Sequence, residues 1–198
     1  SAAPGSAGTL NAQPVSNGLS KIVNATQGQV GPVYGLSYHQ KSNTLLAAAF
    51  MKRFAGFPGS GGDALLGTIH AIDRSSNPNA LATFFTATAG ADSHDYSSDA
   101  LNAPHGDTVA AAAVAKSGWG DIDLSADGSM LYAINLFDRK IYVIPVQQTG
   151  STVTAGAHST IDFPPVVSSG LCANDDWAPG GVKVYHDDVY VTVTCTAE

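Results

Sequence analysis

Carboxylate side chains that could bind a ligand lie in the middle of the sequence, between residues 118 and 146. Asp121 and Asp123 alternate with apolar residues, so a β-strand would present both carboxylates on one face. Two carboxylates placed in this way could bind a cation or the hydroxyl groups of a sugar. In the alternative interpretation they cap turns and pair with Arg139, the next basic residue along the chain. The sequence leaves both roles open, and these three residues are its candidate ligand-binding residues.

A second group of oxygen-rich side chains lies in the polar segment 91–99. Asp92, Asp95 and Asp99 place three carboxylates within eight residues, with His94 among them. Calcium takes six to eight oxygen ligands and tolerates irregular loops, so these aspartates are candidate metal ligands. Their spacing does not match an EF-hand, and a solvated acidic loop is the alternative interpretation. Calcium is therefore the one candidate cofactor, and none is expected to be required.

Sequence motifs of catalysis do not occur in the chain. It contains no Gly-x-Ser-x-Gly elbow, no His-Glu-x-x-His and no glycine-rich phosphate loop that precedes a helix. The six histidines are scattered, without a pair four residues apart. A catalytic triad could still assemble in space, but nothing in the sequence selects its members. We therefore name no catalytic residue, and the sequence favours a non-catalytic function over an enzymatic one.

The two cysteines, Cys172 and Cys195, predict a disulfide if the protein reaches an oxidising compartment. Two buried free thiols are the alternative. The chain begins Ser-Ala-Ala-Pro-Gly, without a starting methionine or a charged and apolar leader. A secreted protein has this appearance after its signal peptide is removed, as does an expression product. The expected location is extracellular or at the cell surface.

Composition and charge exclude several classes of function. The net charge is −7 and the isoelectric point is about 5.1, which argues against nucleic acid as a partner because phosphate binding needs clustered Lys and Arg. No apolar run approaches the roughly 20 residues of a membrane-spanning helix. Hydrophobic residues make up 44% and charged residues 13% of the 198 residues, as in a packed domain rather than a disordered chain.

The elements that would position these side chains are short strands joined by tight turns. Residues 118–146 predict a three-stranded antiparallel meander, the inner part of a β-propeller blade. The same apolar spacing begins again near residue 33 and near residue 178, which indicates a repeat. We therefore expect an extended arm over residues 1–31 and a partial β-propeller over 32–198, with about three blades visible. One alanine-rich helix is expected from Thr108 to Lys116, capped by Asp107.

Two stretches of the repeat resemble a known group of proteins. Gly120-Asp121-Ile122-Asp123-Leu124-Ser125 with the following Asp127-Gly128, and the closing segment Gly181-Val182-Lys183-Val184-Tyr185, are similar to repeats of bacterial surface-exposed β-propellers of the YVTN and NHL kind. The resemblance covers roughly residues 33–198. It implies a large extracellular protein, attached to adhesin-like or sorting modules. It says little about activity, since a fold hosts many functions.

The predicted ring is incomplete, because propellers use four to eight blades and the third repeat stops after two strands. The remainder is expected from a longer chain, a cleaved chain or a neighbouring subunit. The leading hypothesis is a non-catalytic structural or binding module of a bacterial cell-surface protein, acting in adhesion or in assembly with a partner chain. Two alternatives stay open: a propeller hydrolase or lyase that acts on a carbohydrate or ester in the central channel, and a calcium-stabilised scaffold.

Overall fold

Antiparallel β-sheets make up most of the structure, a computed structural model that describes residues 9–11, 23–57, 62–76, 79–96, 106–164, 172 and 176–195. The sheets follow one another along the chain and pair mainly consecutive strands. The predicted all-β class is therefore confirmed. In the described ranges the sheets do not close into a barrel, and the count of blades and their arrangement as a propeller stay predictions.

Sheet 1 is a four-stranded meander formed by the first repeat. Its strands are β3 (Val33–His39), β4 (Thr44–Ala49), β5 (Thr68–Asp73) and β6 (Ala80–Thr86), hydrogen-bonded in that order. A 3-10 turn, η1 (Gln40–Ser42), joins the first two strands, and Asn43 ends it in the left-handed region with a φ of 54°. Asparagine tolerates this backbone conformation, so the predicted turn forms without glycine.

Sheet 2 is formed by the second repeat and has five strands. They are β7 (Trp119–Leu124), β8 (Met130–Asn135), β9 (Lys140–Thr149), β10 (Thr152–Ala155) and β11 (Ser159–Asp162). The order is β7, β8, β9, β10, while β11 pairs with the first half of β9. The long β9 is thus shared by two short strands, β10 and β11.

Sheet 3 has two strands in the described part of the chain, β12 (Trp177–Tyr185) and β13 (Asp188–Cys195). A two-residue turn of His186 and Asp187 joins them, with both residues at positive φ as a tight hairpin needs. A further pair, β1 (Thr9–Asn11) and β2 (Val23–Thr26), is followed by the short helix α1 (Gln27–Val30). Strands β1 and β2 and helix α1 lie within residues 1–31, the segment for which an extended arm is expected.

The two other helices lie in the connections. The turn α2 (Gly62–Leu66) precedes β5, and α3 (Thr108–Ala113) precedes β7. Helix α3 begins where the sequence predicts it and is three residues shorter than the expected span to Lys116. Asp107 occupies the N-cap position, but its side chain makes no capping hydrogen bond and turns to another segment instead. The helix forms from its run of alanines rather than from its cap.

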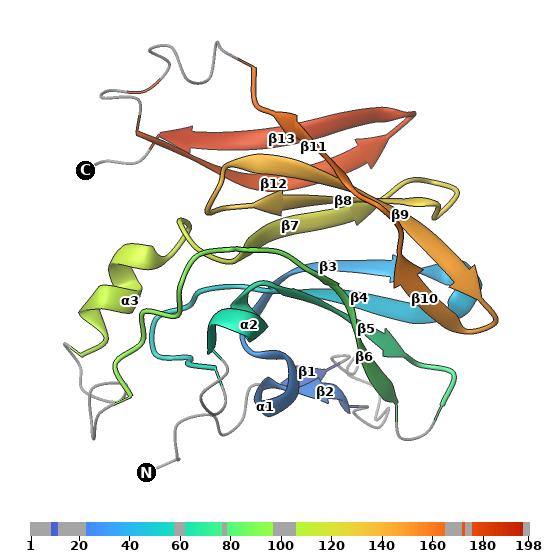
Figure 1. The fold of residues 1–198 in the computed structure, drawn as a ribbon, viewed down its shortest axis with the longest axis horizontal. Helices are drawn as coiled ribbons and strands as arrows, with labels where there is room; N and C mark the ends of the chain where they lie inside the picture. The colour runs from blue at the N-terminus through green and yellow to red at the C-terminus, as the bar shows by residue number, and fades with distance from the viewer. Residues whose placement is uncertain are drawn as a thin grey trace, which may run out of the picture.

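Sheet 2 lies between sheet 1 and sheet 3 as the middle layer of a stack (Figure 1). One of its faces packs on sheet 1 through a core that includes Leu46, Ile69, Ile122 and Leu131. Its other face packs on sheet 3 through a second core, which includes Ile134, Ile141, Phe163, Trp177 and Val182. Both faces of β8 are therefore buried, which explains its near-continuous apolar sequence.

The first strands of the three sheets lie side by side and approach one another closely at glycines. A Cβ atom on Gly35 of β3 would lie 2.6 Å from the carbonyl oxygen of Gly120 on β7. A Cβ atom on Gly120 would in turn lie 2.8 Å from the carbonyl oxygen of Gly180 on β12. Real Cβ atoms do not approach backbone oxygens this closely, so only glycine permits this spacing.

We predict that Gly35→Ala destabilises the protein by about 2–3 kcal/mol, because the methyl group would push β3 away from β7. The free energy of unfolding from urea titration would measure the loss. Gly28→Ala is the matched control, since the nearest atom to its added Cβ is 3.7 Å away, and it should change stability little. Equal stability of the Gly35→Ala variant and the wild type would contradict the proposed close approach.

Candidate functional site

The carboxylates of β7 contact the backbone of β12. Asp121 Oδ2 accepts a hydrogen bond from the amide of Val182 at 3.3 Å, and its Oδ1 accepts one from the amide of Ile122 at 3.0 Å. Asp123 Oδ2 accepts a hydrogen bond from the amide of Val184 at 2.8 Å and lies 2.9 Å from Lys183 Nζ. Both side chains therefore join sheet 2 to sheet 3.

Arg139 lies at the turn between β8 and β9, with a φ of 56°. Its guanidinium carbon lies 5.0 Å from the ring centroid of Trp177, the first residue of β12 and a member of the second core. This contact has the geometry of a cation–π interaction. In the described ranges no ion pair joins Arg139 to Asp121 or Asp123, and each of the three candidate residues contacts sheet 3 separately. Ligand binding by these residues stays a prediction.

Asp92 and its neighbours form a hydrogen-bonded cluster next to α2 and α3, in which His94 is buried and Tyr96 is partly exposed. His94 Nδ1 lies 2.5 Å from Asp92 Oδ1, and the hydroxyl of Tyr96 donates to Asp92 Oδ2 at 2.5 Å. The amide of Asp92 donates to Asp63 Oδ1, also at 2.5 Å. Burial, together with the hydrogen bond to Asp92, raises the pKa of Tyr96 above its ordinary value. The Tyr96 hydroxyl is therefore a donor here, rather than a nucleophile.

The imidazole of His94 joins this cluster to two distant segments. Its Nε2 lies 3.0 Å from the carbonyl oxygen of Lys52 and 3.6 Å from Asp107 Oδ2. Asp107 Oδ2 also accepts a hydrogen bond from the amide of Phe54 at 2.7 Å, while its Oδ1 is buried and has no partner among the described residues. The cluster fastens the loop before α3 to the loop after β4, a link that sequence reasoning missed because Asp107 looked like a helix cap.

The calcium site expected at Asp92, Asp95 and Asp99 is only partly described. Asp92 is engaged with His94 and Tyr96, and Asp99 lies outside the described residues. Among the described residues no group of three or more His, Cys, Asp or Glu side chains has the geometry to hold a metal ion. Calcium binding by this segment therefore stays a prediction.

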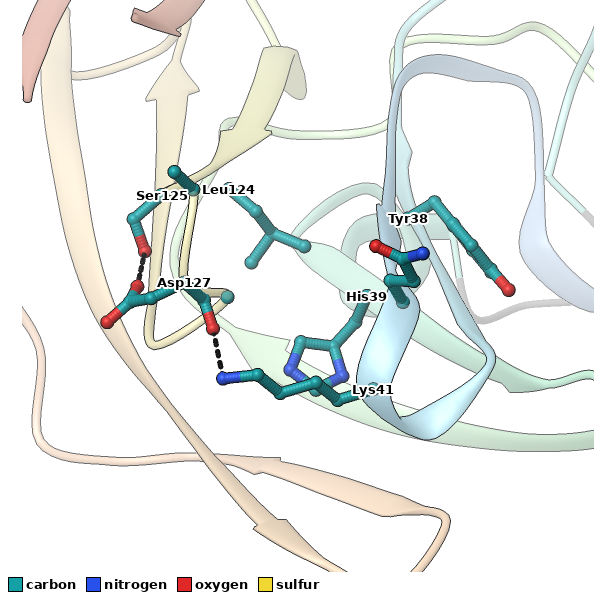
Figure 2. A pocket seen from close by; sticks show the side chains of 9 residues that line it. Tyr38, His39, Lys41, Leu124, Ser125 and Asp127 are labelled. Carbon is teal, nitrogen blue, oxygen red and sulfur yellow. Dashed lines mark hydrogen bonds between the residues drawn. The ribbon is translucent and has the colours of Figure 1, made fainter. Parts of the chain in front are cut away.

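A small pocket lies between the η1 turn of sheet 1 and the β7–β8 turn of sheet 2 (Figure 2). Its volume is about 140 Å³, below the roughly 300–1,000 Å³ of ordinary ligand sites. Its lining comes from two segments that the sequence did not predict to form a pocket, namely Tyr38, His39, Gln40, Lys41, Leu124, Ser125, Ala126, Asp127 and Gly128. The pocket is a small gap at the joint between two sheets.

Several polar side chains at this pocket are hydrogen-bonded to the protein. Lys41 Nζ donates to the carbonyl oxygen of Asp127 at 2.6 Å, and the amide of Ser42 donates to His39 Nδ1 at 3.3 Å (Figure 2 shows the lysine contact). Burial and the charge of Lys41 lower the pKa of His39 below its ordinary value. Hydrogen bonds from Ser125 and Ser129 likewise lower the pKa of the Asp127 carboxyl group. The Lys41 contact joins the two turns, and the other hydrogen bonds lie within each turn.

His70 is a buried histidine in the middle of sheet 1. It lies on β5, opposite Ala47 of β4, and its Nε2 has no hydrogen-bond partner among the described residues. Burial lowers the pKa of His70 from 6.5 to about 4. The structure therefore favours the neutral ring at neutral pH.

The predicted disulfide between Cys172 and Cys195 is confirmed. It links the loop before β12 to the last residue of β13, and Cys172 lies in the second core. Among the described residues no helix is long and apolar enough to span a membrane.

Comparison with known proteins gives a distant relative. The chain is 24% identical over 182 residues to Colossin-D of Dictyostelium discoideum, an alignment that covers 88% of this chain and 17% of that protein. The chain thus spans about a sixth of its relative's length. No family model and no solved structure matches the chain.

The expected resemblance to bacterial surface β-propellers is wrong. The relative found is a protein of a eukaryote, and the comparisons give no propeller family and no bacterial protein. The spacing of Asp127-Gly128 and of the Val182–Tyr185 segment reports antiparallel hairpins, which many unrelated β proteins share.

We predict that Asp123→Ala lowers the free energy of unfolding by about 2 kcal/mol, because the amide of Val184 and the Lys183 ammonium lose their acceptor. Asp123→Asn keeps an acceptor oxygen and should cost less. Urea titration would measure both, with Asp162→Asn as the control, since Asp162 pairs with Lys140 at the exposed surface of sheet 2. Equal effects of Asp123→Ala and Asp162→Asn would contradict a joining role for Asp123.

We also predict that His70 makes stability fall in acid. Because its pKa in the folded protein, about 4, lies below the unfolded value of 6.5, the unfolded state binds the proton first as the pH falls. Stability is then lost between pH 6.5 and pH 4, by up to about 3 kcal/mol. His70→Leu should flatten this part of the profile of unfolding free energy against pH. His186→Asn, in the exposed hairpin turn, should leave the profile unchanged, and a His70→Leu profile equal to that of the wild type would refute the assignment.

Proposed function

We propose that this chain is a non-catalytic structural or binding module that acts outside the cell, in adhesion or in assembly with a partner chain. The main support for this proposal comes from the hydrogen bonds that the candidate carboxylates accept. Asp121 and Asp123 accept hydrogen bonds from the backbone of β12, and so join sheet 2 to sheet 3. These contacts give both carboxylates a role in holding two sheets together, which requires no catalysis.

The proposed location follows from the chemistry of the two cysteines. A disulfide persists in an oxidising compartment and is rare in the cytosol. The bond between Cys172 and Cys195 ties the end of sheet 3 to the second core. An acidic protein with this bond fits secretion, and its charge gives no support to a role on nucleic acid.

The proposed partner is further β structure, from a longer polypeptide, a cleaved chain or a neighbouring subunit. Three sheets stack in chain order, and within the described ranges the third has two strands where the other two have four and five. In this proposal the sheets are blades of an incomplete propeller that the partner completes. The length of Colossin-D, of which this chain matches 17%, is consistent with a module inside a larger protein.

The proposal predicts that the purified chain does not turn over the substrates of the competing hypothesis, a hydrolase or lyase. The wild type and an Asp121→Asn, Asp123→Asn double variant would be assayed on p-nitrophenyl esters, p-nitrophenyl glycosides and soluble polysaccharides. Both proteins should give the same background rate. Asp162→Asn, which removes an exposed carboxylate of sheet 2, serves as a control for preparation effects. The non-catalytic assignment would be overturned if the wild type and the control variant turn over a substrate and the double variant does not.

A further inference from the structure

The outer edge of β13 has no neighbouring strand in the described part of the chain. Sheet 1 continues from its second strand to β5 and β6, and sheet 2 continues to β9 and β10, whereas sheet 3 ends at its second strand. An open edge presents a row of backbone N–H and C=O groups that can pair with another chain. Among the described residues, no strand of sheet 3 therefore holds the position that β5 has in sheet 1 and β9 has in sheet 2.

The register of the hairpin determines which groups point outward. Tyr185 faces Asp188 across the two-residue turn, so this closing pair exchanges hydrogen bonds within the hairpin. The bonding alternates along an antiparallel ladder, and Val189 and Val191 therefore direct their N–H and C=O groups away from β12. Their side chains pack against the second core, while Tyr190 on the opposite face is 55% exposed.

The vacancy also leaves part of sheet 2 uncovered. Ile161 of β11 pairs with Ile141 of β9, so both side chains lie on the face that sheet 3 covers. Ile141 is buried in the second core, but Ile161 is 47% exposed. One additional strand beside β13 would extend the cover of sheet 3 across this face toward β11. An apolar side chain without cover and an open strand edge thus point to the same missing element.

We propose that an extended β-strand from a polypeptide segment outside these 198 residues adds antiparallel to the open edge of β13. Its alternate residues are apolar and cover Ile161, and the residues between them are polar or aromatic and lie beside Tyr190 and Thr192. This inference rests on the proposed assembly with further β structure, and it names the edge and the kind of segment that binds there.

A second copy of this chain fits the edge less well than a separate strand. Each copy carries a net charge of −7. Two copies in contact would therefore repel each other through their net charge. In sheets 1 and 2 the third position is filled by a single strand of the polypeptide that follows in sequence, which is the geometry proposed here.

The test joins a probe strand to the C-terminus of the whole chain through a Gly-Ser linker, which supplies a high local concentration. The probe is Lys-Thr-Val-Thr-Val-Thr-Lys, and the control probe has proline in place of both valines. Hydrogen exchange of the Val189 and Val191 amides would be measured in the fused and unfused proteins. The valine probe should slow exchange of both amides by about tenfold or more, and the proline probe should not.

Substitutions on β13 test the same contact from the other side. Val191→Pro removes an outward N–H group and should abolish the protection of Val189 by the probe, whereas Val191→Ala shortens the side chain, keeps the N–H and should retain protection. If the valine probe gives no more protection than the proline probe, the edge does not accept a strand and the inference fails. It also fails if the unfused chain is a dimer by sedimentation with these amides already protected. Either failure leaves the assays of catalysis unaffected, so the non-catalytic assignment is judged separately.

Discussion

The close approach of β3, β7 and β12 is the constraint on which the rest of the structure depends. Gly35, Gly120 and Gly180 lie in a row across these strands. A Cβ atom on Gly35 would meet the carbonyl oxygen of Gly120, and a Cβ atom on Gly120 would meet that of Gly180. At this spacing the sheets stack with dense cores between them, and a β7 carboxylate reaches the amides of β12 directly. A larger separation would leave those amides to water and open the interior of the stack.

The antiparallel strands could be predicted because their signals are local. The Asp127-Gly128 turn, the apolar run Leu131–Ile134 and the alanines after Asp107 each indicate their structure within a few residues. Contacts between sheets involve residues far apart in sequence, so spacing does not reveal them. His94 between Asp92 and Asp107, and Lys41 bonded to Asp127, are contacts of this kind.

The candidate site illustrates why chemistry is harder to predict than fold. Asp121 and Asp123 have the alternation expected of a ligand-binding strand, yet both accept hydrogen bonds from backbone amides of β12. Backbone amides occur in every sequence and therefore give no sequence signal. The types of side chain do not show that the amides of β12 need a carboxylate acceptor, because that need arises only when β7 and β12 approach each other. The same limit explains the mistaken resemblance: hairpin turns carry strong sequence signals, and they recur in proteins of separate origin.

The disulfide has a mechanical consequence for a module inside a longer polypeptide. The bond between Cys172 and Cys195 closes a covalent loop that contains both strands of sheet 3. Tension applied along the backbone from beyond residue 195 would pass through the sulfur atoms to residue 172 and bypass the hairpin. Strands β12 and β13 would then carry no load and could not be unzipped from that end. The first noncovalent contacts to resist the pull would be those of Cys172 with the core between sheets 2 and 3.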